Sequence, residues 1–230
     1  TIGILAYAWF LLNPQNRGDL LPWGMVICAE VILIFHALMA MWAIFAGRKD
    51  PRTFAFHDAQ RALYDPVVNE NLGVTDDPAR WPLHLDGAPA SVDILITVYG
   101  EPIEVIRRTA EAARAVRGAH STWILDDGRS DEVQALASEL GCRYVRRMSS
   151  SGAKAGNVNN ALTIAKGEYF VILDADFVPR PEFLEETLPF MGEPTVAFVQ
   201  TPQTYGNMSN IISRGAGYIQ HHFGAGGCLQ

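Results

Sequence analysis

Residues 169–179 read YFVILDADFVP, an apolar run that ends in two carboxylates, Asp174 and Asp176. An earlier run, TWILDDG, ends in the same way with Asp126 and Asp127. Short apolar runs bounded by Asp, Gly or Pro are typical of buried strands. The sequence therefore predicts two strands that each end in a pair of acids.

Alternating strands and helices surround these runs from residue 91 onward. Ser130 suits the N-cap of one helix, and Gly118 suits the C-terminal end of another. The expected strands are 92–99, 121–125, 143–147, 168–174 and 195–202, with helices within 102–118, 130–141, 149–167 and 181–191. Nearly continuous apolar strands joined by helices predict an α/β fold, in which helices cover both faces of a parallel sheet.

The predicted strand ends bring several polar side chains to one edge of this sheet. In such folds ligands bind outside the carboxyl ends of the strands. The residues expected there are Tyr99, Glu101, Asp126, Asp127, Asp174 and Asp176. We therefore expect them to converge on one site.

Carboxylates that share a sheet edge repel one another unless a cation neutralises them. Asp174 and Asp176 offer hard oxygen ligands that suit Mg²⁺ or Mn²⁺. A metal held by only two carboxylates usually completes its shell with water and substrate phosphates. The pair thus predicts a metal-bound diphosphate, with a solvated turn as the alternative.

The two acids of the earlier pair are expected to differ. Asp127 precedes Gly128 in a turn, where its carboxylate can accept hydrogen bonds from a nucleotide. One of two neighbouring residues should point back into the fold, and Asp126 suits a turn or helix-entry role better. Asp127 is therefore the ligand-binding candidate, with a structural turn aspartate as the alternative.

The segment SGAKAGNVNNAL combines small residues with one cation, Lys154, ahead of a helix. It can place Lys154 and backbone N–H groups near phosphate, although a surface loop with a solvated lysine is the alternative. The phosphate-loop pattern G-x-x-x-x-G-K-[ST] is absent. So is G-x-G-x-x-G after the first strand, which argues against a dinucleotide oxidoreductase.

The N-terminal part predicts membrane helices. Residues 23–46 form an apolar run long enough to span a bilayer, and residues 1–12 are read as the end of another span. Residues 47–90 follow as a connector whose first residues are basic, which places everything after the span in the cytoplasm. Glu30 and His36 lie within the span, either packed against neighbouring helices or lining a path.

Composition narrows the function classes. Hydrophobic residues make up 49% of the 230-residue chain and the net charge is −7, which argues against nucleic-acid binding. The three cysteines are scattered and form no C-x-x-C pair, so neither a zinc site nor a disulfide framework is predicted.

The stretch from Val92 to Gln203 resembles the first half of a family 2 glycosyltransferase catalytic domain of the membrane-embedded cellulose synthase type. Five ordered motifs carry the resemblance: DILITVYGEP, LDDG, AKAGNVNNAL, LDADFVP and FVQTPQ. Several motifs at compatible spacing are more specific than any one alone. The resemblance covers about half of the chain and implies a nucleotide-sugar-binding, GT-A-like domain over residues 91–230, incomplete on its C-terminal side and preceded by transmembrane helices.

The resemblance also implies a role for each motif. The implied donor-binding residues are Tyr99, Glu101, Asp127, Lys154 and Asp174, the metal ligands are Asp174 and Asp176, and the acceptor-side residues are Gln200, Thr201 and Pro202. The resemblance also makes Asp127 the candidate for a catalytic contribution, which would consist of holding the uridine of the donor in position. The family's general base lies in a T-E-D motif that this chain lacks, so we expect it beyond Gln230 and expect this chain alone to be inactive. This chain departs from the family pattern at two positions, with Val98 where the family often has Thr and Gly100 where it often has Asn, and these affect the expected contacts to uracil or to the donor sugar.

A processive, inverting glycosyltransferase is the implied activity. It would use a UDP-sugar, with UDP-glucose as the expected donor, to extend a β-linked polysaccharide such as cellulose at the inner face of the bacterial plasma membrane. The expected partners are the UDP-sugar, the growing polysaccharide and membrane lipids. The alternatives are a mannan, chitin or hyaluronan synthase, a single-sugar transferase to a lipid acceptor, and a non-catalytic nucleotide-sugar-binding membrane protein.

Overall fold

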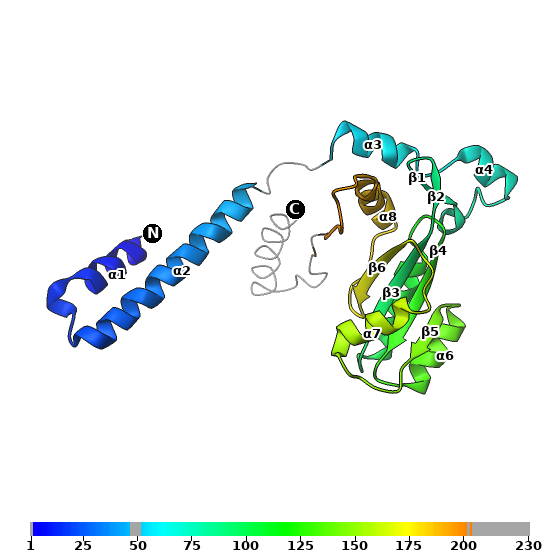
Figure 1. The fold of residues 1–230 in the computed structure, drawn as a ribbon. Helices are drawn as coiled ribbons and strands as arrows, with labels where there is room; N and C mark the ends of the chain where they lie inside the picture. The colour runs from blue at the N-terminus through cyan, green and yellow to red at the C-terminus, as the bar shows by residue number, and fades with distance from the viewer. Residues whose placement is uncertain (1, 47–51, 202, 204–230) are drawn as a thin grey trace. The chain divides into compact units, whose positions relative to one another are not determined.

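The computed structural model describes residues 2–46, 52–201 and 203. It divides into two compact units, one containing the N-terminal helices and the other spanning Arg52–Val199 (Figure 1). All of the strands in the described part of the chain lie in the second unit.

The first unit contains helices α1 (Ile2–Leu12) and α2 (Leu20–Ala46), joined by the short 3₁₀ helix η1 (Pro14–Asn16). The helix α2 begins three residues before the predicted span, and it accommodates Pro22 in its first turn, where a missing N–H costs little. Its 23 residues from Leu20 to Trp42 are long and apolar enough to cross a membrane. The Tyr7 hydroxyl of α1 donates to the Glu30 carboxylate of α2 at 2.9 Å, so Glu30 has a neighbouring helix as its partner.

The second unit is built on a four-stranded parallel sheet, as predicted. Its strands, in the order β5-β4-β3-β6, are β5 (Arg143–Arg146), β4 (His120–Asp126), β3 (Val92–Val98) and β6 (Tyr169–Asp174). The helices are α5 (Ile103–Arg114), α6 (Asp131–Glu139), α7 (Ala153–Leu162), α8 (Phe183–Thr187) and the 3₁₀ helix η3 (Leu188–Gly192). Each of the three crossovers between the strands contains one helix, which is what parallel pairing requires.

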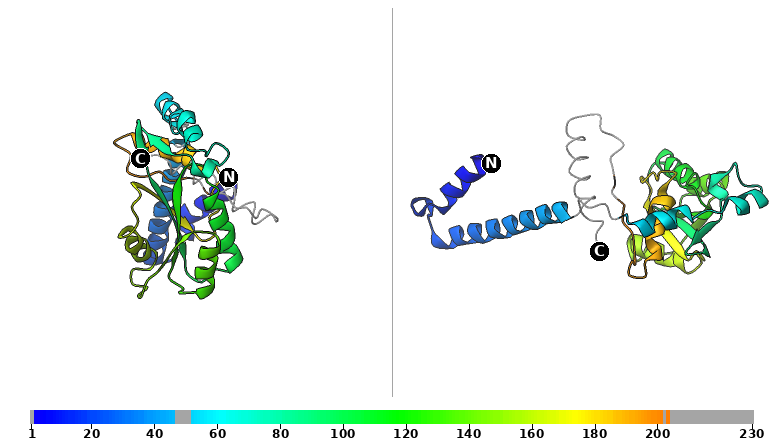
Figure 2. Two further views of the ribbon diagram at one scale, coloured as in Figure 1. Left: turned by 90° about the vertical axis from the view of Figure 1, so that its right-hand side faces the viewer. Right: turned by 90° about the horizontal axis from the view of Figure 1, so that it is seen from above.

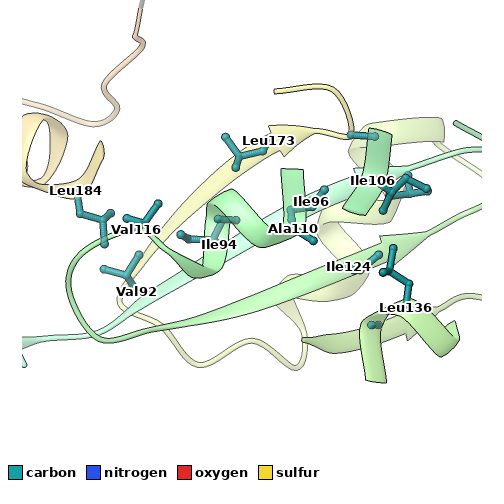
Figure 3. Packing of buried hydrophobic residues seen from close by; sticks show 14 of the residues in the cluster. Val92, Ile94, Ile96, Ile106, Ala110, Val116, Ile124, Leu136, Leu173 and Leu184 are labelled. Carbon is teal, nitrogen blue, oxygen red and sulfur yellow. The ribbon is translucent and has the colours of Figure 1, made fainter. Parts of the chain in front are cut away.

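Alternate residues of the strands build two cores. Ile94 and Ile96 of β3 pack with Ile106 of α5 and Leu136 of α6 on one face (Figure 3). Leu95 faces the other way, into a smaller cluster with residues of α7. Figure 2 shows the sheet edge-on, with α7 on one side and α5 and α6 on the other. Because β3 is covered on both faces, all seven of its residues are buried.

The predicted strand at 195–202 is not formed. Residues 196–201 have no regular secondary structure, and Pro202 lies outside the described residues. A strand needs a partner for its N–H and C=O groups as well as an apolar pattern. Within the described part of the chain, β6 pairs with β3 alone and has no partner at its other edge.

The predicted connector contains more structure than the sequence suggested. It holds α3 (Phe54–Arg61), α4 (Pro66–Asn71), the 3₁₀ helix η2 (Pro78–Arg80) and a hairpin of β1 (Leu83–Leu85) and β2 (Ala88–Ala90). Asp86 and Gly87 turn the hairpin with φ of +50° and +77°. An Asp-Gly pair in this conformation is the strongest short-range hairpin signal, so the hairpin has a local cause in the sequence.

Contacts tie this connector to α8 and η3. The Phe56 ring lies 4.5 Å from that of Phe190, and the Gln60 side chain donates to the Glu185 carbonyl at 3.0 Å. The Tyr64 hydroxyl donates to the Glu185 carboxylate at 3.3 Å. Residues 52–90 therefore belong to the same compact unit as the sheet.

Candidate functional site

A cavity of about 540 Å³ opens at the carboxyl ends of β3, β4 and β6. That volume lies within the range of small-molecule sites. The predicted residues that line it are Tyr99, Glu101, Asp127, Lys154, Asp174 and Asp176. The convergence expected from the strand ends is therefore present.

Strand register decides which acids face this cavity. Thr97 of β3 lies beside Asp174 of β6, and both residues line the cavity. Val98 lies beside Asp126 of β4. Successive side chains of a strand point to opposite faces, so Asp126 points away from the face of Thr97 and Asp174.

Asp126 holds the turn that leads into α6. It is fully buried and accepts hydrogen bonds from the backbone N–H groups of Arg129 (3.0 Å) and Ser130 (2.7 Å) and from the Tyr144 hydroxyl (2.8 Å). Burial raises the pKa of Tyr144, which keeps that hydroxyl protonated as a donor. The structural role predicted for Asp126 is confirmed.

Asp127 lines the cavity but is already paired. The Arg147 guanidinium donates from Nε at 2.5 Å and from Nη2 at 2.6 Å to the two carboxylate oxygens, and both side chains are less than 10% exposed. Hydrogen bonding to Asp127 raises the pKa of Arg147. The same guanidinium donates to the carbonyls of Ser151 and Ala153. Arg147 therefore fixes the Asp127 carboxylate and the loop that leads to Lys154.

The Asp174 and Asp176 carboxylates are more open. Asp174 accepts a hydrogen bond from the Thr97 hydroxyl at 3.3 Å and forms an ion pair with the Lys154 ammonium. Asp176 is exposed and lines the same cavity. Lys154 thus balances part of the negative charge at the position predicted for a metal.

Glu101 shapes the turn that presents Tyr99. Its carboxylate accepts the Tyr99 backbone N–H at 2.7 Å, and the Tyr99 side chain is 72% exposed at the cavity. Gly100, between them, has φ of +85°. Glycine adopts this conformation without a steric cost, and Asn is among the residues that tolerate it next best, which accounts for the departure at this position.

These residues fit a metal that arrives with phosphates. Among the described residues, no group of three or more His, Cys, Asp or Glu side chains could hold a metal by itself. The two carboxylates of Asp174 and Asp176 suit a hard divalent cation whose remaining ligands are phosphate oxygens and water.

Two further residues of the site did not emerge from the sequence. Arg147 belongs to a run of basic residues with no signal to single it out. Asn157 lines the cavity and is 2% exposed; its amide N–H donates to the Leu125 carbonyl at 2.9 Å, and its Oδ1 has no partner. Its place in AGNVNN, one helical turn after Lys154, is the signal that could have identified it.

The acceptor-side prediction stays a prediction. Gln200 and Thr201 lie in the irregular stretch after η3, and Pro202 lies outside the described residues. Neither of the two described residues belongs to the unit that contains the cavity.

Comparison with known proteins now identifies the family. The model of glycosyl transferase family 2 matches residues 93–225, more than half of the chain. The chain belongs to glycosyl transferase family 2. The parallel sheet flanked by helices, with its acids at the strand ends, is the catalytic-domain fold expected of this family.

Curated relatives in this family include cellulose synthase catalytic subunits [UDP-forming]. The protein of Xanthomonas axonopodis pv. citri (strain 306) is 37% identical over 144 residues, which cover 61% of this chain and 19% of that protein. The protein of Pseudomonas fluorescens (strain SBW25) is 35% identical over the same length, covering 61% and 18%. The chain therefore spans about a fifth of the length of these family 2 relatives.

Among solved structures, the mannosyltransferase PcManGT from Pyrobaculum calidifontis, in complex with GDP-Man and Mn²⁺, is similar to this family 2 chain. It is 18% identical with a TM-score of 0.47, over 76% of this chain and 47% of that chain. That similarity is too distant to carry information on function.

Proposed function

We propose that this chain carries the donor-binding part of a processive, inverting glycosyltransferase that uses a UDP-sugar, with UDP-glucose as the expected donor, to extend a β-linked polysaccharide such as cellulose. The observation that carries the proposal is the convergence of Asp127, Lys154, Asp174 and Asp176 in one cavity of a family 2 domain. The similarity to cellulose synthase catalytic subunits supports the choice of product.

In the proposed reaction an acceptor hydroxyl attacks the anomeric carbon of the donor sugar. The bond from that carbon to the diphosphate breaks, and UDP leaves. The hydroxyl proton passes to a general base, which we propose is not one of the residues that line the cavity. Direct displacement of this kind inverts the anomeric centre.

The chain's own residues position the donor for that step. Asp127, held by Arg147, accepts an N–H of the base, and Tyr99 offers an aromatic face beside it. In this proposal Lys154, which lines the cavity, donates to the diphosphate, and Asp174 and Asp176 would hold Mg²⁺ or Mn²⁺. The metal would supply Lewis-acid stabilisation of the leaving diphosphate. These contacts contribute mainly by orienting the reactants.

The N-terminal helices suggest where the reaction takes place. α2 is long enough to span a bilayer, and basic residues follow it in the sequence. We place the catalytic unit on the cytoplasmic side of the bacterial plasma membrane, in a multi-pass protein.

A calorimetric titration of UDP into the chain in detergent, first with Mn²⁺ and then with EDTA, tests the proposal. We expect binding that requires the metal. Asp176→Ala should abolish the metal-dependent part because it removes one of two ligands, whereas Asp76→Ala, which removes an equal charge from an exposed position outside the cavity, should not. Metal-independent binding, or equal binding by both variants, would contradict the metal assignment.

A further inference from the structure

A second cavity of about 380 Å³ adjoins the one described above. The two cavities share Tyr99, Asp127 and Ser150, and the second adds Gly100, Gly128 and Arg129. Lys154, Asp174 and Asp176 line the first cavity only. A nucleoside diphosphate that places its phosphates at Asp174 and Asp176 therefore has room for its base on the far side of Tyr99 and Asp127.

The fold holds the Arg129 backbone at this cavity. Arg129 has φ of +57°, a left-handed conformation that is uncommon for residues other than glycine. Its N–H donates to the buried Asp126 carboxylate at 3.0 Å, and the next N–H, of Ser130, donates to the other oxygen at 2.7 Å. The turn is thus fixed from inside the protein, independently of the Arg129 side chain.

The Arg129 guanidinium is available for a ligand. The neighbouring arginines are paired: Arg146 with Asp131 at 2.8 Å, and Arg147 with Asp127. Arg129 makes one long contact, from Nη2 to the Ser150 hydroxyl at 3.5 Å. Within the described part of the chain, no carboxylate forms an ion pair with it, and its side chain is exposed.

We propose that Arg129 selects the base of the nucleotide, by donating a hydrogen bond to carbonyl O4 of uracil while Asp127 accepts the neighbouring N3–H. The proposal rests on the proposed function, because it takes a nucleoside diphosphate as the ligand. Uracil presents a donor flanked by two acceptors, which complements a carboxylate beside a guanidinium.

Cytosine presents the opposite pattern at the same two positions. Its N3 carries a lone pair toward the Asp127 carboxylate, and its amino group would face the Arg129 guanidinium. A site built to hydrogen-bond one pattern rejects a ligand that leaves its polar groups unpaired. Arg129 therefore acts as a specificity residue for UDP against CDP, separate from the cation Lys154 at the diphosphate end.

Parallel titrations of UDP and CDP, with Mn²⁺, into the wild-type chain in detergent and two variants test this assignment. Met keeps the stem of Arg129 and has the same preference against left-handed backbone. Arg129→Met should weaken UDP binding by roughly tenfold without weakening CDP binding, because the lost hydrogen bond is to a group that only uracil has. Lys154→Met, the matched cation control, should weaken both ligands by a similar factor.

Equal weakening of UDP and CDP by Arg129→Met, or no change in either, would overturn the proposal. Absence of any UDP binding by the wild-type chain would instead reject the proposed function, and this proposal with it. Thermal unfolding checks that the variant folds. If Arg129→Met does not fold, the wild-type chain provides a second test. A UDP analogue that lacks O4 should then bind roughly tenfold more weakly than UDP, and equal binding of the two ligands would reject the assignment.

Discussion

Two acid pairs end the strands on either side of β3, yet their surroundings differ. At the end of β4, Asp126 is 0% exposed and accepts from two backbone N–H groups and a tyrosine, whereas the next residue, Asp127, is 7% exposed and pairs with an arginine. Asp174 on β6 has one hydroxyl and the Lys154 ammonium, and Asp176 is exposed.

The comparison shows that the same sequence pattern can lie in two different environments. At the end of β4 the protein supplies internal partners: Asp126 organises the turn, and Arg147 holds the Asp127 carboxylate in place. At the end of β6 the acids have fewer internal partners, and they are the pair that we propose as ligands of a cation. The availability of donors, rather than the acids themselves, separates the two roles.

The largest expected change in stability comes from breaking the Asp127–Arg147 pair, and it tests whether the acids at the end of β4 depend on internal partners. Arg147→Met leaves the Asp127 charge buried without its partner, so we expect a loss of about 3 kcal/mol in the free energy of unfolding. Urea unfolding of the chain in detergent measures it. Adding Asp127→Asn should recover much of the loss because no buried charge remains. A double variant as unstable as Arg147→Met would show that packing, not charge, was lost.

The next effect compares one acid from each pair. Asp126→Ala leaves three donors without an acceptor at a fully buried position, and we expect it to cost about 2 kcal/mol. Asp176→Ala, at an exposed position, should change stability by less than about 0.5 kcal/mol. The same unfolding experiment measures both. Similar losses for the two variants would remove the distinction between a structural pair and a ligand-binding pair.

The smallest expected effect is a change in metal affinity, which tests whether Lys154 competes with a metal at Asp174. Lys154 balances Asp174 before any metal is bound, so Lys154→Met should raise the affinity for Mn²⁺ alone, by roughly twofold to fivefold for an exposed ion pair of about 0.5–1 kcal/mol. The same variant should lower the affinity for UDP in the presence of Mn²⁺. Titration of each ligand separately distinguishes these opposite changes. A fall in both affinities would mean that Lys154 does not compete with the metal.

Much of the fold could be predicted because its signals are local. The four strands, the helices between them and the position of the acids at the strand ends follow from apolar runs, capping residues and crossovers of the right length. The hairpin at Asp86 and Gly87 had an equally local signal that was overlooked. The apolar run at 195–202 failed as a strand prediction because its pattern says nothing about a pairing partner.

The sequence by itself determined that β3, β4 and β6 end in polar and acidic residues at one edge of the sheet, since side-chain alternation and parallel connections follow from the order of residues. Only the tertiary structure decided which of these acids have internal partners. Arg147 reaches Asp127 across 20 positions of sequence, and Tyr144 reaches Asp126 across 18. Contacts at such separations depend on the packed geometry of neighbouring strands and loops, which no local pattern encodes.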